Sequence, residues 1–229
     1  MYSFSLLIWR AGCCNFIMLT GYKYESIRIL RSEDVIAWEL LSTAEPHVDL
    51  EEHFGLMAVP EQKKHFFAQL SHATFSAEGE KYHLNATSSL LLETDFLERL
   101  REETLYLDKL VIEITDLENM IESDPVRIFS LRKCIATLRQ RGSEVWADDV
   151  TETILWKLFE CAIHFDGIKI DKYTFWNGRK ERNEFLQLAE CCMYLTNKLL
   201  IEGIETESDL ALARASVAEF GQGYLWRNA

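Results

Sequence analysis

The sequence predicts an α/β fold of the TIM-like (β/α)8 barrel type, in which strands and helices alternate around a closed sheet. Eight short apolar runs rich in β-branched and aromatic residues recur along the chain. Amphipathic segments at helical spacing lie between most of these runs. This alternation over roughly 200 residues is typical of a barrel. The alternative is an open doubly wound sheet, although no G-x-G-x-x-G motif follows the first run to support it.

The predicted strands are, in chain order, residues 24–30, 35–41, 82–87, 110–115, 144–149, 167–171, 199–205 and 221–226. Residues 130–142 form one of the predicted helices between them. In this segment Leu131, Ile135 and Leu138 share a face, and Gly142 follows as a helix C-cap glycine would.

Two further segments between the strands have less regular patterns. A helix is predicted to begin near Thr206 and Ser208 and to end at Gly221. The acidic stretch EPHVDLEEHFG, residues 45–55, is predicted to be a solvated loop rather than a metal site.

Length and composition indicate one large domain, which we place at residues 21–229 after a lead-in segment, residues 1–20. The chain has 229 residues, is 48% hydrophobic and contains no Gly/Ser-rich linker. Its formal net charge of −13 argues against binding a DNA or RNA polymer, which requires a basic face. A small anionic substrate is still compatible with this charge, because a divalent metal can reverse the sign of one acidic pocket.

The cysteines and the N-terminus predict a cytoplasmic protein without a membrane span. The six cysteines form no C-x-x-C pair and lie in apolar surroundings, so reduced, buried thiols are expected. Residues 1–20 are apolar, but Arg10 and Asn15 interrupt them before a spanning length is reached. Arg10 also lies inside the apolar stretch, whereas a signal peptide carries its basic residues first. Membrane association through this segment is the remaining alternative.

Polar side chains recur where the predicted strands end, which in a barrel is the catalytic face. They are Glu39, Asn85, Glu113, Asp148, Asp149, Lys169, Asp171, Glu202, Glu205 and Gln222. Residues i and i+2 of a strand point the same way, so Lys169 and Asp171 can face one pocket. Oxygen ligands in this number, with no paired histidines among them, favour Mg²⁺ or Mn²⁺ over zinc.

Each of these residues alone has a plainer interpretation. A carboxylate after a strand is commonly a helix N-cap, and an isolated lysine is commonly a solvated charge. In EVWADDVTETI, residues 144–154, Asp149 with Thr151 and Glu152 could begin a helix, or Asp148 and Asp149 could hold metal. The repetition of acids at one relative position of successive strands favours the metal site.

Taken in order, these motifs resemble the EAL domain, a family of bacterial cyclic di-GMP phosphodiesterases. The resemblance runs from about Tyr24 to Leu225. Its motifs are Glu39-Leu40-Leu41 for E-A-L, Asn85, Glu113-Ile114-Thr115-Asp116 for E-L-T-E, Asp148-Asp149 for the D-D pair, Lys169-Ile170-Asp171 for K-I-D, Glu202-Gly203-Ile204-Glu205 for E-G-V-E and Gln222-Gly223-Tyr224 for Q-G-Y.

This resemblance implies a TIM-like barrel with one antiparallel strand, a two-metal site and hydrolysis of cyclic di-GMP to linear pGpG. The implied metal ligands are Glu39, Asn85, Glu113, Asp148 and Asp149. The implied catalytic residues are Glu202, as a general base or a ligand through water, Lys169, which would steady the water or the phosphate, and Glu205. Gln222, Asp171 and Leu41 would support or contact the substrate. The expected partners besides cyclic di-GMP are a second copy of the chain and a regulatory protein.

Four departures from the family pattern keep other functions open. Thr43 stands where the family has an arginine, Glu25-Ser26-Ile27 replaces Q-P-I, and Asp116 is shorter than the usual glutamate. Val150–Thr153 replaces a glycine-containing loop, which removes residues that adopt positive φ readily. The alternatives are an EAL module that binds cyclic di-GMP or a partner without turnover, and an unrelated barrel enzyme that uses Mg²⁺.

Overall fold

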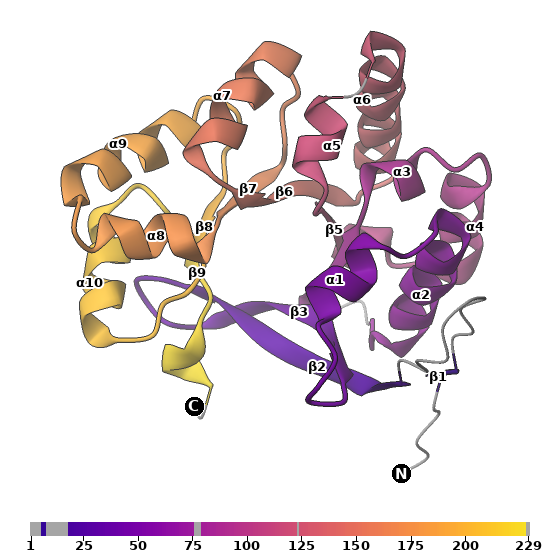
Figure 1. The fold of residues 1–229 in the computed structure, drawn as a ribbon, viewed down its shortest axis with the longest axis horizontal. Helices are drawn as coiled ribbons and strands as arrows, with labels where there is room; N and C mark the ends of the chain where they lie inside the picture. The colour runs from indigo at the N-terminus through magenta and orange to yellow at the C-terminus, as the bar shows by residue number, and fades with distance from the viewer. Residues whose placement is uncertain (1–5, 8–17, 76–78, 123, 228–229) are drawn as a thin grey trace.

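The computed structural model describes residues 6–7, 18–75, 79–122 and 124–227, and these residues form the predicted closed barrel (Figure 1). Neighbouring strands pair in sequence order, and β2 closes the barrel by pairing with β9. The barrel strands are β2 (Met18–Ile29), β3 (Val35–Ala44), β4 (Lys81–Ala86), β5 (Leu110–Ile114), β6 (Glu144–Val150), β7 (Gly167–Ile170), β8 (Leu199–Ile201) and β9 (Phe220–Gly221). A two-residue strand, β1 (Leu6–Leu7), pairs with the start of β2.

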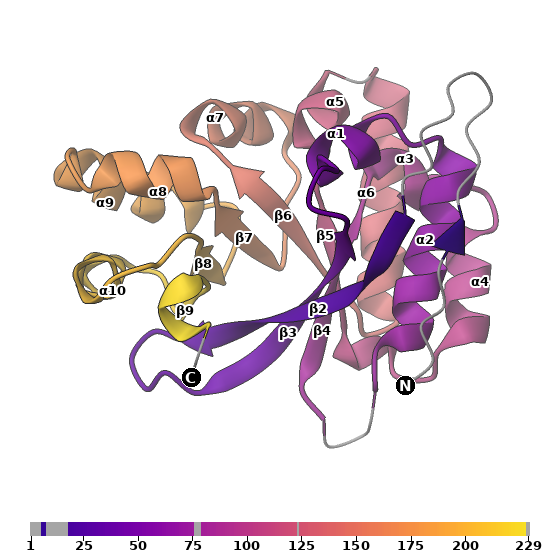
Figure 2. The same ribbon diagram turned by 60° about the horizontal axis from the view of Figure 1, so that its bottom comes forward.

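One strand of the barrel is reversed, as the sequence resemblance implies. β2 pairs antiparallel with both β3 and β9, whereas the other barrel strands pair parallel. Residues 30–34 connect β2 to β3 by a turn in which the Glu33 N–H donates to the Ile29 carbonyl at 2.8 Å. A connection this short cannot cross over to a parallel neighbour, so the two strands form a hairpin, whose long ribbon is visible in Figure 2.

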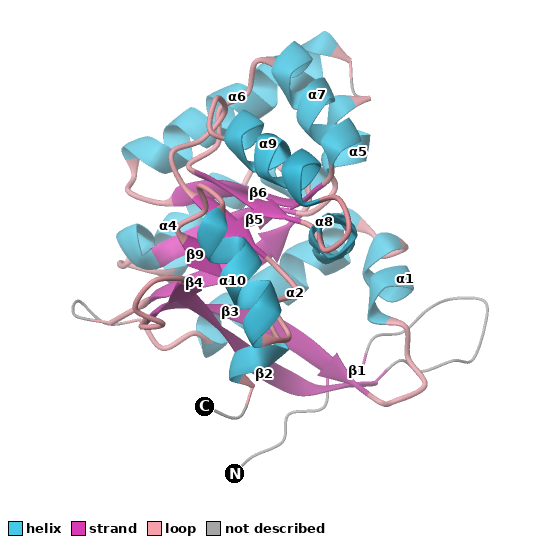
Figure 3. Cartoon of the chain, turned by 90° about the vertical axis from the view of Figure 1, so that its left-hand side faces the viewer, coloured by secondary structure: helices cyan, strands magenta, loops and turns pink. Residues whose placement is uncertain are grey.

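Helices cover most of the outer side of the barrel, whereas the outer side of the β2–β3 hairpin is less covered (Figure 3). They are α1 (Leu50–Gly55), α2 (Val59–His72), α3 (Ser88–Leu91), α4 (Phe96–Glu103), α5 (Leu117–Ile121), α6 (Pro125–Gln140), α7 (Glu152–Cys161), α8 (Lys172–Gly178), α9 (Arg182–Cys192) and α10 (Glu207–Ala215), with short 3₁₀ turns at Leu107–Lys109 and Tyr224–Trp226. The predicted helix at residues 130–142 belongs to α6, which begins earlier because Asp124 caps it and Pro125 occupies its first turn.

Several boundaries and one element type predicted from sequence are wrong; for example, β2 begins at Met18 and β8 already ends at Ile201. The helix that starts at Thr206 ends at Ala215 instead of Gly221, because the chain must extend again to form β9 beside β8. The last strand is confined to Phe220–Gly221, and the rest of its predicted range turns into the 3₁₀ segment. Part of the acidic stretch at residues 45–55 is α1, which begins because the Asp49 carboxylate accepts the Glu52 N–H at 3.1 Å.

The barrel interior has an apolar layer below the strand ends. It consists of Ile27, Ala37, Val111, Trp146, Leu200 and Phe220, all of which are buried. The Trp146 indole occupies the space that a side chain on β7 would otherwise take, because Gly167 is its direct neighbour in the parallel ladder. This layer forms a solid floor beneath the strand ends.

Replacing Gly167 by alanine is expected to destabilise the protein by about 1–3 kcal/mol, because the new Cβ would overlap the Trp146 ring in the packed floor. Chemical denaturation measures this change in the free energy of unfolding. Gly55→Ala is a matched control, because a Cβ on Gly55 meets no atom within 4 Å. Equal stabilities of the two variants would contradict the tight contact.

The cysteines that the structure describes agree with the prediction of reduced thiols. Cys134, Cys161, Cys191 and Cys192 are free thiols, whereas Cys13 and Cys14 lie outside the described residues. In the described part of the chain, no helix combines the length and the apolar character that crossing a bilayer requires.

Candidate active site

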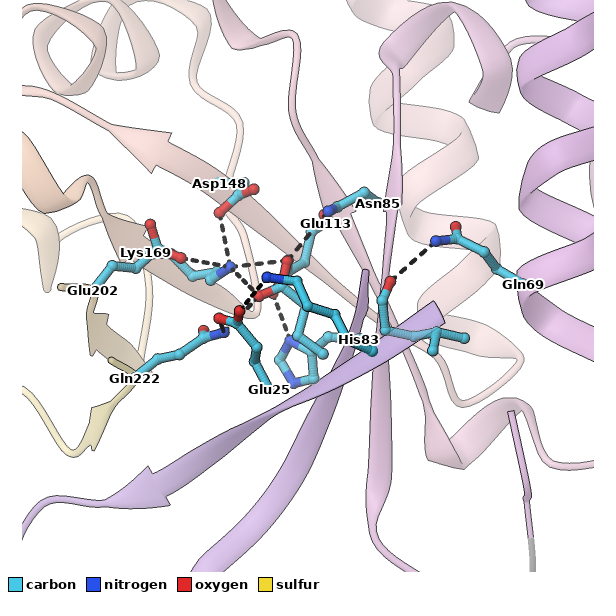
Figure 4. Close-up of polar contacts among 12 residues, drawn as sticks. Glu25, Gln69, His83, Asn85, Glu113, Asp148, Lys169, Glu202 and Gln222 are labelled. Atoms are coloured by element: carbon cyan, nitrogen blue, oxygen red, sulfur yellow. Dashed lines mark hydrogen bonds and ion pairs between the residues drawn. The ribbon is translucent and has the colours of Figure 1, made fainter. Parts of the chain in front are cut away.

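The polar residues at the strand ends form a second interior layer directly above the apolar floor. On β3, β5, β6, β8 and β9 the polar residue comes two positions after a floor residue, as in Val111 and Glu113 or Leu200 and Glu202. On the reversed strand β2 the order is inverted, so Glu25 comes two positions before Ile27. Figure 4 shows these side chains converging from different strands on one region.

Lys169 is the centre of this layer. Its ammonium pairs with Glu202 at 2.8 Å, Glu113 at 3.0 Å, Asp148 at 3.0 Å and Glu39 at 3.3 Å, each from a different strand or strand end. The Lys169 side chain is only 1% exposed, so the interpretation of Lys169 as a solvated charge is wrong. One ammonium faces four carboxylates, which leaves excess negative charge in a buried place and favours binding of a further cation.

The carboxylates form two groups that could each hold a metal ion and that share Asp148. One group is Glu39, Glu113 and Asp148, and the other is Asp148, Asp149 and Glu202; within each, the ligand oxygens lie within 4.8 Å of one another. Asp149 reaches the second group because it has a φ of 50° and the β6–β7 pairing shifts register there. Such a bulge redirects a side chain, and aspartate tolerates the left-handed region better than most residues.

Asn85 and Gln222 complete the oxygen donor set. The Asn85 amide donates to Glu39 Oε1 at 3.2 Å, whereas its own buried oxygen accepts no hydrogen bond from the described residues. Such an oxygen beside three carboxylates fits a hard divalent cation such as Mg²⁺, Mn²⁺ or Ca²⁺. The Gln222 amide donates to Glu39 Oε2 at 2.7 Å and Glu25 Oε2 at 3.4 Å, so it separates two carboxylates that lie directly opposite each other.

His83 is a site residue that sequence reasoning missed, since the histidines formed no recognisable motif. Its Nδ1 lies 2.6 Å from Glu113 Oε1, and its ring packs edge-on against Trp146. Burial, with a smaller contribution from the Lys169 charge, lowers the pKa of His83 to about 3, so the imidazole is neutral. The available signal was period two along β4, because His83 precedes Asn85 by two residues.

Burial and mutual repulsion shift the acids of the cluster in different directions. Burial raises the pKa values of Glu113, Glu202 and Asp148, and neighbouring carboxylates raise them further although Lys169 opposes this. For Glu39, the Lys169 charge and the Gln222 hydrogen bond outweigh burial, so its pKa is lowered. Without metal the cluster therefore holds protons that a divalent cation would displace.

At Asp149, the competition between protons and a divalent cation is expected near pH 7. Although the residue is exposed, its carboxylate lies against the cluster, so desolvation and then the Asp148 charge raise its pKa to about 7. We expect Mn²⁺ affinity to rise as the pH increases through about 7. In the metal-free protein, a pKa raised from 3.8 makes stability fall as the pH rises between about 4 and 7. Calorimetric titration at several pH values tests the affinity, and Asp149→Asn should flatten its pH dependence. A flat profile in the unmodified protein would contradict the shift.

Three residues predicted to serve catalysis or the substrate lie outside the Lys169 cluster. Asp171 caps α8, where its carboxylate accepts the Thr174 N–H at 2.8 Å. Glu205 lies 3.4 Å from Arg179, which also binds Asp209. Leu41 is on the same face of β3 as Glu39 and is half-buried. Of the two interpretations of residues 144–154, the cap of α7 is Thr151, which leaves Asp148 and Asp149 at the cluster.

Comparison with known protein families gives a match over residues 24–229 to the EAL domain. The chain belongs to the EAL domain family. The match covers every residue of the Lys169 cluster and the strands that carry them. A comparison with curated protein sequences gives no significant match.

Solved structures of EAL proteins share the fold. An EAL domain protein from Listeria monocytogenes has a TM-score of 0.72 at 18% identity, covering 90% of this chain and 86% of that one. BlrP1 from Klebsiella pneumoniae, solved with calcium and cyclic di-GMP, has a TM-score of 0.71 at 18% identity over 90% of this chain and 54% of that one. YkuI from Bacillus subtilis, solved with its substrate cyclic di-GMP and calcium, has a TM-score of 0.70 at 20% identity over 90% and 53%. The EAL chain described here thus spans about half the length of BlrP1 and YkuI.

Proposed function

We propose that this EAL domain hydrolyses one phosphodiester of cyclic di-GMP with Mg²⁺ or Mn²⁺ and releases linear pGpG. The observation that most supports this function is the pair of overlapping carboxylate groups that share Asp148. Two adjacent cation positions are the arrangement that phosphodiester hydrolysis uses in other two-metal enzymes. The structures of BlrP1 and YkuI, which contain cyclic di-GMP with calcium, are consistent with the same ligand here.

In this proposal Glu39, Asn85, Glu113, Asp148 and Asp149 hold the cations. Bound divalent cations would lower the pKa of the attacking water and offset charge on the phosphodiester oxygens. The Asn85 amide and Gln222 amide keep Glu39 oriented through hydrogen bonds to both of its oxygens. Neutral His83, which lies next to the apolar layer, orients Glu113 through the contact between its Nδ1 and Glu113 Oε1.

Glu202 and Lys169 carry out the proton and charge steps. Glu202 is the most accessible carboxylate around Lys169, with its side chain 17% exposed, and its pKa is raised by burial. It therefore can take the proton of an incoming water as general base. The surrounding acids raise the pKa of Lys169 despite its burial, so it stays protonated and can donate to the attacking water or a phosphate oxygen.

Incubating the purified protein with cyclic di-GMP and Mg²⁺ or Mn²⁺ tests this function by product analysis. We expect linear pGpG as the product. We expect Glu39→Ala to remove the activity, because Glu39 belongs to one of the two carboxylate groups that could hold a cation. Loss of activity on adding a chelator, reversed by excess Mn²⁺, is the second expected result. Absence of both turnover and binding in the unmodified protein would refute the proposal.

A second candidate function is a module that binds cyclic di-GMP, or a protein partner, without turnover. The connection after Asp149 favours it: β6 ends at Val150 and α7 begins at Glu152, so only Thr151 lies between them and also caps the helix. Such a tight connection restricts movement of the segment next to the cation ligands. Binding of cyclic di-GMP with no pGpG formed would select this function over hydrolysis.

A further inference from the structure

Lys23 occupies the interior face of the barrel, one step further toward the mouth than the acidic layer. Along the reversed strand β2, Ile27 lies in the apolar floor, Glu25 lies opposite Glu39, and Lys23 lies opposite Leu41. The three β2 residues are spaced by two and therefore share one face. Because β2 runs antiparallel to its neighbours, its residues with lower numbers lie closer to the mouth.

The Lys23 side chain is tied to the acidic layer and is also open to solvent. Its ammonium pairs with Glu25 Oε1 at 2.5 Å, and the Gln222 amide links Glu25 to Glu39. The Lys23 side chain is 39% exposed, so a ligand entering the mouth can reach the ammonium. Glu25 therefore fixes the position of the Lys23 ammonium, and the ammonium is accessible from the barrel mouth.

Other interior lysines on the described strands are not available to a ligand at this mouth. Lys169 is 1% exposed and engaged by the four carboxylates. Lys81, at the start of β4, and Lys198, just before β8, both pair with Glu144 at the opposite end of the barrel. Diagonally across from Lys23, Thr43 lies opposite Gly21 on the same face of β3 as Leu41 and carries no charge. Among the lysines of the described strands, Lys23 is thus the accessible interior cation at this mouth.

We propose that Lys23 binds a phosphate of the substrate at the barrel mouth. This inference rests on the proposed function. Cyclic di-GMP has two phosphodiesters, and cations held by the two carboxylate groups can engage the one that is cleaved. The other phosphodiester is also an anion and would lie near the carboxylates around Lys169, so a positive charge that faces it would favour binding. An ammonium hydrogen-bonded to a phosphate oxygen supplies that charge, and Glu25 holds it in place.

Equilibrium binding of cyclic di-GMP with Ca²⁺, together with KM and kcat wherever turnover occurs, tests the role of Lys23. We expect Lys23→Ala to weaken binding by about 10-fold or more and to raise KM more than it lowers kcat. Lys23→Arg should retain most of the affinity. Lys133→Ala, which removes an exposed lysine of α6, is the matched control and should leave binding unchanged.

Two further variants separate phosphate binding from simple neutralisation of Glu25. If Lys23 only neutralises Glu25, the double variant Lys23→Ala/Glu25→Gln regains the lost affinity, which would overturn the inference. If Lys23 binds phosphate, the double variant stays weak, whereas Thr43→Arg in the Lys23→Ala background restores affinity from the facing strand. Unchanged affinity of Lys23→Ala also overturns the inference while leaving the proposed function intact. Failure of the unmodified protein to bind cyclic di-GMP overturns the proposed function, and this inference with it.

Discussion

Replacing Lys169 by methionine should lower the free energy of unfolding of the metal-free protein by about 3–5 kcal/mol. Methionine nearly matches the length of the lysine stem, so the change removes the ammonium and little packing. Glu39, Glu113, Asp148 and Glu202 would then face one another in the barrel interior without the charge that each contacts at 3.3 Å or less. Part of the loss will be recovered by protonation, because burial already raises the pKa of Glu113 and Glu202.

Urea or thermal unfolding in the presence of a chelator measures this effect. Lys133→Met, an exposed lysine on α6, is the control and should change stability little. Adding Mn²⁺ should stabilise the Lys169→Met protein more than the unmodified protein, because divalent cations then replace the missing positive charge. Equal stability of the metal-free Lys169→Met and unmodified proteins would contradict the ion cluster around Lys169.

Under the proposed function, replacing Asp148 by asparagine should reduce hydrolysis of cyclic di-GMP by about 10³-fold or more, as expected for the loss of several kcal/mol of charge stabilisation. Asp148 is common to both carboxylate groups that could hold a cation, so the substitution weakens cation binding in both groups. Asparagine keeps the shape and one oxygen, which separates loss of charge from loss of packing. The measurement is pGpG formation under saturating Mn²⁺.

Stability of the same variant provides the internal control. Burial raises the pKa of Asp148, which means that its charge is unfavourable in the metal-free fold. Asp148→Asn should therefore unfold at the same temperature as the unmodified protein or higher in chelator, yet gain less stability from Mn²⁺. Glu102→Gln, an exposed carboxylate of α4, should change neither property. Full activity of Asp148→Asn would contradict the shared-ligand arrangement.

The sequence alone predicted the strands and most of the site, because both depend on local patterns. Buried parallel strands must be apolar and β-branched, so they stand out against the intervening helices. The acids recur two positions after interior apolar residues, as in Ala37 and Glu39 or Trp146 and Asp148. In a parallel barrel the ends of all such strands meet at one mouth, so a linear pattern implies a cluster in space.

Only the tertiary structure decided which polar residues contact one another. Asp171 and Glu205 follow strands just as Asp148 and Glu202 do, yet Asp171 caps α8 and Glu205 faces Arg179. Direction at a strand end depends on bulges, such as the one at Asp149, and on where the next helix begins.

The same limit explains His83, Lys23 and the early end of α10. His83 and Lys23 have ordinary local surroundings and become site residues only when β4 and β2 close the barrel. The α10 segment remains amphipathic beyond Ala215, but the ladder partner that Leu200 offers to Phe220 ends the helix. Local periodicity determined the elements and the interior face. Pairing between distant strands determined the ion cluster, because its energy arises from charges more than a hundred residues apart, such as Glu39 and Lys169.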